Sequence, residues 1–254
     1  MNIHAKPLRL RPQPDAAVPG TAMVLAAGLG KRMRPLTATR PKPLVEVAGR
    51  ALLDHALDRL RAAGVGHAVV NVHYLADNLE AHVARTPQEG LRISISDERA
   101  QLLETGGGLV HALPLIDSDP FLVVNSDNLW IDGPVDSLRM LSRHWDDARM
   151  DALLLLVPLA RANNHSGHGD FHMDRDGRIS RRRVGRVAPF VYTGIQIVSK
   201  RLIVDAPTGP FSFNLFWDRA IAAGRCFGAS HQGLWFDVGT PGAVAATAAV
   251  IAGG

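Results

Sequence analysis

A short glycine-rich run near the start of the chain, with three cations close by, is suited to bind a polyphosphate. The run Gly28-Leu-Gly-Lys-Arg32 follows an apolar stretch at 22–25, and Lys42 stands further on between Pro41 and Pro43. Glycines let backbone N–H groups come close to a ligand, and Lys and Arg side chains form charge-assisted hydrogen bonds with phosphate oxygens. The prolines limit the backbone around Lys42, so its ammonium is presented with little freedom. We therefore predict a phosphate-binding loop, because a plain turn with exposed cations explains the whole run poorly.

Two better-known glycine loops do not fit this run. In a Walker A loop, Leu25 would have to be glycine and Arg32 would have to carry a hydroxyl. The dinucleotide fingerprint lacks its third glycine, because Met33 stands there, and no acidic residue follows about 20 positions later. A dinucleotide-dependent oxidoreductase is therefore disfavoured, and absence of NAD(P) binding by calorimetry would remove it.

Two aspartates follow apolar runs that are typical of buried strands. Asp127 ends the run Val123-Val-Asn-Ser, and Asp237 follows Trp235-Phe236 just before a predicted helix. Mg²⁺ commonly takes one or two carboxylates together with substrate phosphates, so such a pair is chemically suited to a metal on a triphosphate. Asp237 could alternatively cap the helix that follows it.

The stretch from Leu25 to Thr37, with the run Pro41-Lys-Pro-Leu44, resembles the signature of the sugar-phosphate nucleotidyltransferases. The resemblance implies transfer of a nucleoside monophosphate from an NTP to a sugar 1-phosphate, with release of pyrophosphate and no covalent intermediate. It also implies Mg²⁺ as cofactor, held by Asp127 and Asp237, with Arg32 and Lys42 on the phosphates. A non-catalytic nucleotide sensor is the alternative from another class, and pyrophosphate release would exclude it.

The same resemblance assigns the remaining parts of the site. It makes the triple-glycine segment 103–108 the base-recognition loop, for which a flexible linker is the alternative. The run Gly169-Asp-Phe171 resembles the sugar-binding stretch of the N-acetylmuramate-1-phosphate uridylyltransferases, and Tyr192-Thr-Gly194 resembles the strand that closes their sugar pocket. We expect Asn125 to point at the sugar or the ribose, or else to close its own turn.

Two further details of these segments lead to expectations. Ser126 stands where many relatives carry glycine, so it would be strained if that position needed a positive φ. His165 and His168 have no other residues at ligand spacing nearby, so we interpret them as solvated loop histidines rather than metal ligands. Asn71, at the end of a predicted strand, is more simply structural than ligand-binding.

The predicted site residues form overlapping sets. The catalytic set is Arg32, Lys42, Asp127 and Asp237, of which the two aspartates are also the predicted metal ligands. The predicted nucleotide-binding residues are Ala26, Ala27, Gly28, Gly30, Lys31, Arg32, Met33, Lys42, Glu104, Gly106 and Gly107. The predicted sugar-binding residues are Asn125, Asp170, Thr193 and Gly194.

The resemblance favours one pair of substrates. The Asn-x-Asp run, the Glu-Thr-Gly-Gly-Gly segment and the Gly-Asp-Phe run favour UTP with N-acetylmuramate 1-phosphate, which would place the enzyme in peptidoglycan recycling. The main rival is mannose-1-phosphate guanylyltransferase, because the purine-specific members share almost the whole signature.

Composition bounds the partners and the compartment. The chain has 254 residues, 46% hydrophobic and 20% charged, with a formal charge of +4 and a pI near 9.7, so anionic partners are favoured. Nucleotides and sugar phosphates meet that description, whereas nucleic acid is disfavoured by scarce aromatics and the lack of a reader motif. No apolar run approaches the roughly 20 residues of a membrane span. The single cysteine, Cys226, fits a reducing cytoplasm. The sequence leaves open the oligomeric state and whether the basic run 181–183 is a solvated hairpin or a contact for phosphate or a partner.

The pattern of short apolar runs and amphipathic segments predicts an α/β protein with a doubly wound, mainly parallel sheet of Rossmann-like nucleotidyltransferase type. Residues 1–20 hold four prolines and little periodicity, so we interpret them as a disordered arm before a single domain at 21–254. We expect strands at 22–26, 67–72, 91–96, 121–125, 151–157, 190–198 and 226–230. We expect helices at 52–63, 77–84, 107–112, 135–145, 214–223 and 241–251.

Overall fold

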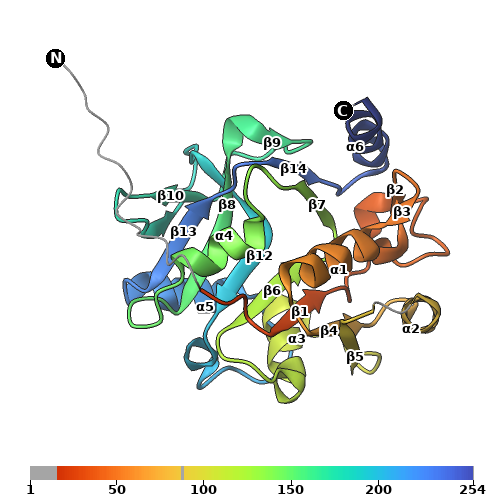
Figure 1. The fold of residues 1–254 in the computed structure, drawn as a ribbon, viewed down its shortest axis with the longest axis horizontal. Coiled ribbons are helices and arrows are strands. Elements are labelled where there is room, and N and C mark those ends of the chain that lie inside the picture. The colour runs from red at the N-terminus through yellow and green to blue at the C-terminus, as the bar shows by residue number, and fades with distance from the viewer. Residues whose placement is uncertain (1–15, 87–88, 254) are drawn as a thin grey trace.

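A central sheet of nine strands organises the computed structural model, which describes residues 16–86 and 89–253 (Figure 1). Its main path is β11 (Ile179–Arg181), β10 (Phe171–Met173), β12 (Phe190–Val198), β6 (Phe121–Asn125), β1 (Thr21–Leu25), β4 (His67–Val72) and β5 (Arg92–Asp97). The other two strands, β8 (Ala152–Pro158) and β13 (Cys226–Ser230), extend the sheet beside β12.

The sheet is parallel around β1, which the phosphate loop follows, and mixed on the other side of β6. Strands β6, β1, β4 and β5 run parallel, and β13 runs parallel to β8. By contrast, β12 runs antiparallel to each strand that it pairs with, namely β6, β8 and β10, and β10 runs antiparallel to β11. The apolar runs did not reveal these antiparallel pairings. The predicted α/β class is confirmed, and the pairings of β12 and of β10 with β11 are the departure from a parallel sheet.

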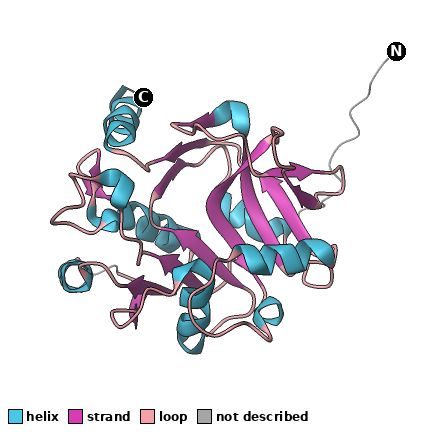
Figure 2. Ribbon diagram, turned by 180° about the vertical axis from the view of Figure 1, so that it is seen from behind, coloured by secondary structure: helices cyan, strands magenta, loops and turns pink. Residues whose placement is uncertain are grey.

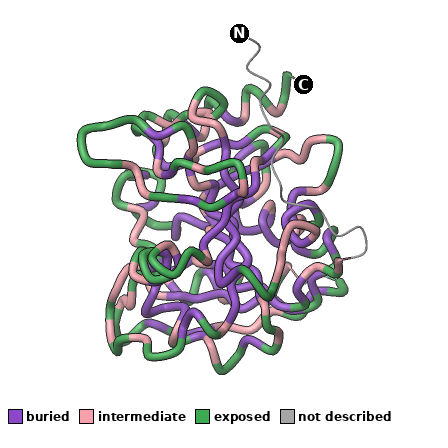
Figure 3. Tube along the Cα trace, turned by 90° about the vertical axis from the view of Figure 1, so that its left-hand side faces the viewer, coloured by how far each residue is buried: buried purple, intermediate pink, exposed green. Residues whose placement is uncertain are grey.

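Helices cover both faces of the sheet, as a doubly wound fold requires (Figure 2). One hydrophobic cluster joins Ala22 and Val24 of β1 to α1 (Leu52–Ala63), α2 (Ala76–Arg85) and α4 (Ser137–His144). The other cluster joins Met23 of β1 to α3 (Glu104–Ala112) and α5 (Asn214–Ala222). Because successive side chains of a strand point to opposite faces, β1 supplies both clusters and is buried between them. Figure 3 shows that the buried stretches of the chain gather in the middle of the molecule.

A second, smaller set of elements stands beside the carboxyl ends of the parallel strands. It consists of the strands β7 (Asn128–Ile131), β14 (Leu234–Asp237) and β9 (Ala162–Asn163), the hairpin β2 (Glu46–Val47) and β3 (Arg50–Ala51), and α6 (Pro241–Gly253). A third cluster, which includes Met33, Leu129 and Phe236, packs β2, β7, β14 and α6 together. Single 3-10 turns complete the chain: η1 (Lys31–Met33), η2 (Lys42–Leu44), η3 (Leu113–Leu115), η4 (Leu159–Arg161) and η5 (Lys200–Ile203).

The predicted arm lies mostly outside the described residues. Of its residues, 16–20 are described, and Val18 packs against the core while the Gly20 carbonyl accepts hydrogen bonds from the N–H groups of Gly66 and His67. The predicted arm therefore includes at its end a segment that contacts the fold. None of the helices in the described residues has the length and hydrophobicity that crossing a membrane requires.

Candidate active site

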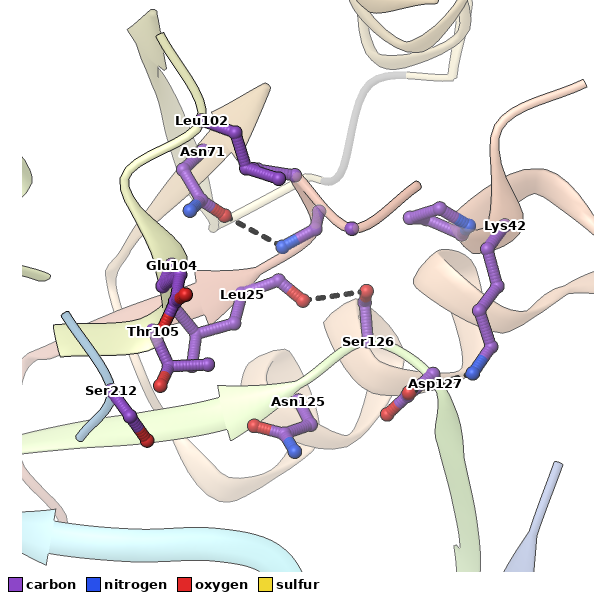
Figure 4. A pocket seen from close by; sticks show the side chains of 14 residues that line it. Leu25, Lys42, Asn71, Leu102, Glu104, Thr105, Asn125, Ser126, Asp127 and Ser212 are labelled. Atoms are coloured by element: carbon purple, nitrogen blue, oxygen red, sulfur yellow. Dashed lines mark hydrogen bonds and ion pairs between the residues drawn. The ribbon is translucent and has the colours of Figure 1, made fainter. Parts of the chain in front are cut away.

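A cavity of about 380 Å³ opens at the carboxyl ends of β1 and β6 (Figure 4). These strands lie side by side, and the last residues paired between them are Leu25 of β1 and Asn125 of β6. This is the place where an open α/β sheet binds its ligand. The cavity is lined by Leu25, Ala26, Ala27, Gly28, Lys42, Pro43, Asn71, Leu102, Glu104, Thr105, Asn125, Ser126, Asp127 and Ser212.

Ser126 links the ends of the two strands. Its backbone N–H and its hydroxyl both donate to the Leu25 carbonyl, at 3.1 and 2.7 Å, and the residue is buried. The expectation of strain at this position is not met, because Ser126 is not among the positive-φ residues of the described chain. Its side chain instead adds a hydrogen bond that glycine cannot make.

The two glycines of the phosphate loop have different surroundings. Gly30 is left-handed, with φ 61°, and a Cβ there would lie 3.0 Å from Thr37 and 3.2 Å from the Lys42 side chain. A Cβ on Gly28 would meet nothing within 4 Å, so that stretch of backbone faces open space. Met33 is fully buried in the third cluster and anchors the loop. The loop is therefore fixed at Gly30 and Met33 and open to a ligand at Gly28.

The cations of the loop surround a second hollow of about 250 Å³ beside the first. Lys31 and Arg32 are exposed there, and neither side chain forms a hydrogen bond or ion pair within the described residues. Lys42 is only 9% exposed, and its ammonium lies 2.7 Å from Asp127 Oδ2 (Figure 4). Two cations are thus free for an anion, while the third already neutralises a carboxylate.

The small sheet brings the two predicted metal-binding aspartates together. Strand β7 begins directly after Asp127, and its first residue, Asn128, pairs with Asp237 at the end of β14. A Cβ on Gly239 would lie 2.9 Å from Asp237 Oδ1 and 3.5 Å from both terminal nitrogens of Arg32, so both side chains lie beside Gly239. Hard carboxylate oxygens from two adjacent strands suit Mg²⁺. Within the described residues no group of three or more His, Cys, Asp or Glu side chains could hold a metal, so substrate oxygens would have to complete the shell.

His165 differs from its interpretation as a solvated loop residue. Its side chain is 17% exposed, and Nδ1 lies 3.8 Å from Asp237 Oδ2. The parallel pairing of β9 with β14 brings this histidine to the aspartate, a contact that residue spacing did not indicate. His168, by contrast, is exposed as expected.

The triple glycine is a packed helix start rather than a flexible loop. The N–H groups of Gly106 and Gly107 donate to the Phe211 carbonyl at 2.8 and 3.1 Å. They are therefore not available to read the edge of a base, which corrects the sequence-based interpretation of these two residues. Glu104 and Thr105 line the cavity instead, and Glu104 is held in a left-handed conformation with φ 58°.

The predicted sugar-binding residues are only partly brought together. Asn125 lines the cavity, and its amide makes no hydrogen bond within the described residues. Gly194 packs against it, because a Cβ at Gly194 would lie 3.0 Å from Asn125 Cβ. Thr193 is fully buried, and its hydroxyl donates to the Leu155 carbonyl, so Thr193 could act on a sugar only through its backbone. The carboxylate of Asp170 accepts the N–H of Tyr192 at 2.9 Å and does not line the cavity.

A smaller recess of about 170 Å³ continues from the cavity past Asn125. Tyr192, Gln196 and Trp217 contribute to its lining. The Tyr192 hydroxyl is buried without a hydrogen-bond partner among the described residues, and burial raises the pKa of this phenol, so it stays protonated and able to donate. This recess was not predicted, because its residues come from strands and a helix far apart in the sequence.

Sequence reasoning also missed Leu102, Thr105 and Ser212 as cavity residues. Ser212 belongs to a segment without periodicity, and it reaches the site through the hydrogen bonds that join the segment to α3. Nothing in the local sequence signals such a contact. The basic run 181–183 is partly structural, since Arg181 pairs with Asp218 while Arg183 is exposed.

Comparison with known proteins agrees with this geometry. The nucleotidyl transferase family model matches residues 21–183, which contain the phosphate loop, Lys42, Asp127 and Asp170. The chain belongs to this family. Asp237 and α6 lie beyond the matched residues of the nucleotidyl transferase model.

Curated members of the nucleotidyl transferase family match almost the whole chain. It is 48% identical to the N-acetylmuramate alpha-1-phosphate uridylyltransferase of Caulobacter vibrioides, over 92% of this chain and 98% of that protein. It is 36% identical to the protein of the same name from Neisseria meningitidis serogroup B, over 86% of this chain and 93% of that one. The predicted resemblance to sugar-phosphate nucleotidyltransferases is confirmed.

A solved structure supports the fold. HddC from Yersinia pseudotuberculosis, crystallised with GMP-PN, superposes with a TM-score of 0.73 at 22% identity and covers 91% of this chain and 99% of its own. At that identity the likeness concerns the fold alone.

Proposed function

We propose that this nucleotidyl transferase joins UTP to N-acetylmuramate 1-phosphate, giving UDP-N-acetylmuramate and pyrophosphate. The observation that carries the reaction class is the gathering of Arg32, Lys42, Asp127 and Asp237 around the second hollow, beside the cavity. The choice of substrates is supported by the 48% identity to a relative of that name. A place in peptidoglycan recycling and in the reducing cytoplasm follows from that choice, and the buried, unbridged Cys226 is compatible with it.

In the proposed reaction an oxygen of the sugar 1-phosphate attacks the α-phosphorus of UTP. The new P–O bond forms as the bond from the α-phosphorus to the α,β-bridging oxygen breaks, and both bonding electrons leave with pyrophosphate. The chain contributes positioning and charge: open backbone at Gly28 for the triphosphate, and Arg32 with Lys42 for the developing negative charge. Mg²⁺ held by Asp127 and Asp237 would supply further charge neutralisation on the phosphate oxygens.

We place the uracil and ribose between Ala26 and Glu104, and the acceptor sugar at the Asn125 end. The free amide of Asn125 and the unpartnered Tyr192 hydroxyl of the adjoining recess support this placement, because both offer hydrogen bonds to a polyhydroxylated ring. Asp170 would act on the sugar through its Oδ1, which has no hydrogen-bond partner among the described residues, or indirectly through Tyr192.

The proposed function is tested by a matrix of four NTPs against several sugar 1-phosphates, read as pyrophosphate release. UTP with N-acetylmuramate 1-phosphate should be the best pair. A clear preference for GTP with mannose 1-phosphate would instead make the enzyme a guanylyltransferase, and absence of pyrophosphate with every pair would indicate a nucleotide sensor.

The metal-binding pair is tested separately. Asp127→Asn and Asp237→Asn keep the shape but remove charge, so turnover should fall by roughly a hundredfold, or about 2.7 kcal/mol of transition-state stabilisation. Calorimetry should also show weaker Mg²⁺ binding. Asp58→Asn is the matched control, because that aspartate pairs with Arg50 on the surface and does not line the cavity. Near-normal turnover of either site variant would make its aspartate a spectator.

A further inference from the structure

A buried chain of hydrogen bonds connects the phosphate loop to the segment that leads into α3. The Ala26 N–H donates to Asn71 Oδ1 at 2.6 Å, and Asn71 Nδ2 donates to Glu98 Oε1 at 2.6 Å. Glu98 Oε2 accepts the N–H of Leu103 at 3.2 Å. This series of hydrogen bonds therefore connects one wall of the cavity, at Ala26, to the other wall beside Glu104. Figure 4 shows its first side chain, Asn71, on the same side of the cavity as Glu104.

The buried carboxylate of Glu98 depends on its two hydrogen-bond donors, the Asn71 side-chain amide and the Leu103 N–H. It is 2% exposed, as is Asn71, and no Lys or Arg of the described residues forms an ion pair with it. A buried carboxylate without a cation is costly unless N–H groups satisfy it. The surrounding packing is fitted to it, because a Cβ on Gly108 would lie 2.6 Å from Glu98 Oε1. Its position is therefore determined by Asn71 on one side and Leu103 on the other.

We propose that Asn71 and Glu98 are positioning residues that fix the separation of the two cavity walls. This inference rests on the proposed nucleotide site. A nucleoside triphosphate must contact both walls at once: its phosphates contact the phosphate loop, and its base contacts the wall beside Glu104. Preformed spacing removes an ordering cost from such a ligand, whereas a ligand that contacts one wall gains nothing from it.

The geometry also predicts which pair of substitutions restores the series of hydrogen bonds from Ala26 to Leu103. In Glu98→Gln, one of the two donors, Asn71 Nδ2 or the Leu103 N–H, faces an amide nitrogen instead of an oxygen. In Asn71→Asp, two carboxylates face each other where 2.6 Å now separates a donor from an acceptor. In the double variant, Asp at 71 accepts from Ala26 and from the new glutamine amide, and the glutamine oxygen accepts from Leu103. Every donor is again satisfied, and the net charge equals that of the wild type.

The test is calorimetry on the full chain with Mg²⁺, using UTP and inorganic tripolyphosphate as probes. Glu98→Gln and Asn71→Asp should each weaken UTP binding by about tenfold or more, and tripolyphosphate binding by less than about threefold. The double variant should recover UTP affinity to within about threefold of the wild type. Asp97→Asn is the matched control, because it removes one negative charge from the neighbouring, exposed side chain, and it should change neither affinity.

The outcomes separate this inference from the proposed function. Equal weakening of both probes, or a double variant no better than the poorer single variant, would overturn the positioning role. Where Glu98→Gln does not fold, Asn71→Ala replaces it, since Glu98 then keeps the Leu103 N–H, and UTP should again be weakened selectively. A wild-type chain that binds tripolyphosphate but no NTP would instead overturn the proposed nucleotide site.

Discussion

The two glycine-rich segments of the site look alike in the sequence and serve opposite purposes. At Gly28 a side chain would enter open space, whereas at Gly106, Gly107 and Gly108 it would collide with Phe211, the Gly209 carbonyl and the Glu98 carboxylate. The first segment keeps a place for a ligand, and the second lets parts of the protein pack closely. Glycine therefore marks a close approach, and only the fold shows whether the approaching group is a substrate or the protein itself.

Charge separates the two segments in the same way. Lys31, Arg32 and Lys42 surround the phosphate loop, whereas Glu104 is the charged residue with which α3 begins. Substitutions at the phosphate loop should therefore affect ligand binding and catalysis, while substitutions at the triple glycine should affect folding.

The largest expected effect is at Lys42. Lys42→Ala removes a cation held between prolines and leaves Asp127 without its 2.7 Å partner, so catalytic efficiency should fall about a hundredfold, or roughly 2.7 kcal/mol. Steady-state kinetics should show a smaller loss for Lys31→Ala, whose side chain is exposed and unpaired within the described residues. The reverse ranking would mean that the loop presents its other side to the phosphates.

Gly107→Ala should destabilise the fold. A Cβ there would lie 2.3 Å from the Gly209 carbonyl oxygen, and backbone cannot move aside as a flexible side chain can. Overpacking of this kind costs about 2 kcal/mol, measurable by denaturant unfolding. An unchanged free energy of unfolding would contradict the packing role of the second segment.

Gly28→Ala should show the opposite pattern. The free energy of unfolding should stay within about 0.5 kcal/mol of the wild type, because the new methyl group meets nothing within 4 Å. The Michaelis constant for UTP should rise about tenfold, or roughly 1.4 kcal/mol, because the methyl group occupies space reserved for the triphosphate. A normal Michaelis constant would show that the triphosphate does not pass over Gly28.

The smallest expected effect is in the reactivity of Cys226. Burial raises the pKa of its thiol to about 12, so at neutral pH the thiolate is scarce and labelling requires opening of the core. The rate of labelling by a thiol reagent should be the same in Gly28→Ala as in the wild type and faster in Gly107→Ala. Faster labelling of Gly28→Ala would contradict the view that its loop is independent of the core.

The longer elements were predictable because each carries its own signal. The helix over Leu52–Ala63 has a continuous apolar face and ends at Gly64, whose φ of 97° suits glycine. The strands His67–Val72 and Phe121–Asn125 are mostly apolar and β-branched, with polar residues near or at their ends. Strands of two to four residues, such as β7, β9 and β14, are too short for periodicity to identify.

The site divides along the same line. Arg32 and Lys42 could be predicted because one recognisable stretch, from Leu25 to Leu44, carries them, and Asp127 because it ends an apolar run. The pairing of Asp127 with Asp237 as metal ligands was expected from the resemblance. Glu98 and His165 were missed as site-related residues, because their partners Asn71 and Asp237 are distant in the sequence and their side chains meet only in the folded chain. The packing role of Gly106 was missed for the same reason, since Phe211 lies far along the chain.

The position of Asp237 near the end of the chain has a consequence for synthesis. All nine strands of the main sheet lie in residues that precede β14, so the ribosome synthesises the whole sequence of the sheet before it adds Asp237. A chain that stops short of β14 would keep the phosphate loop, Lys42 and Asp127 but lose the strand that pairs with β7. The same truncation would remove Phe236 and Val238 from the third cluster, in which Met33 anchors the phosphate loop. The last strand to be synthesised therefore supplies both the second carboxylate and part of the support of the first loop.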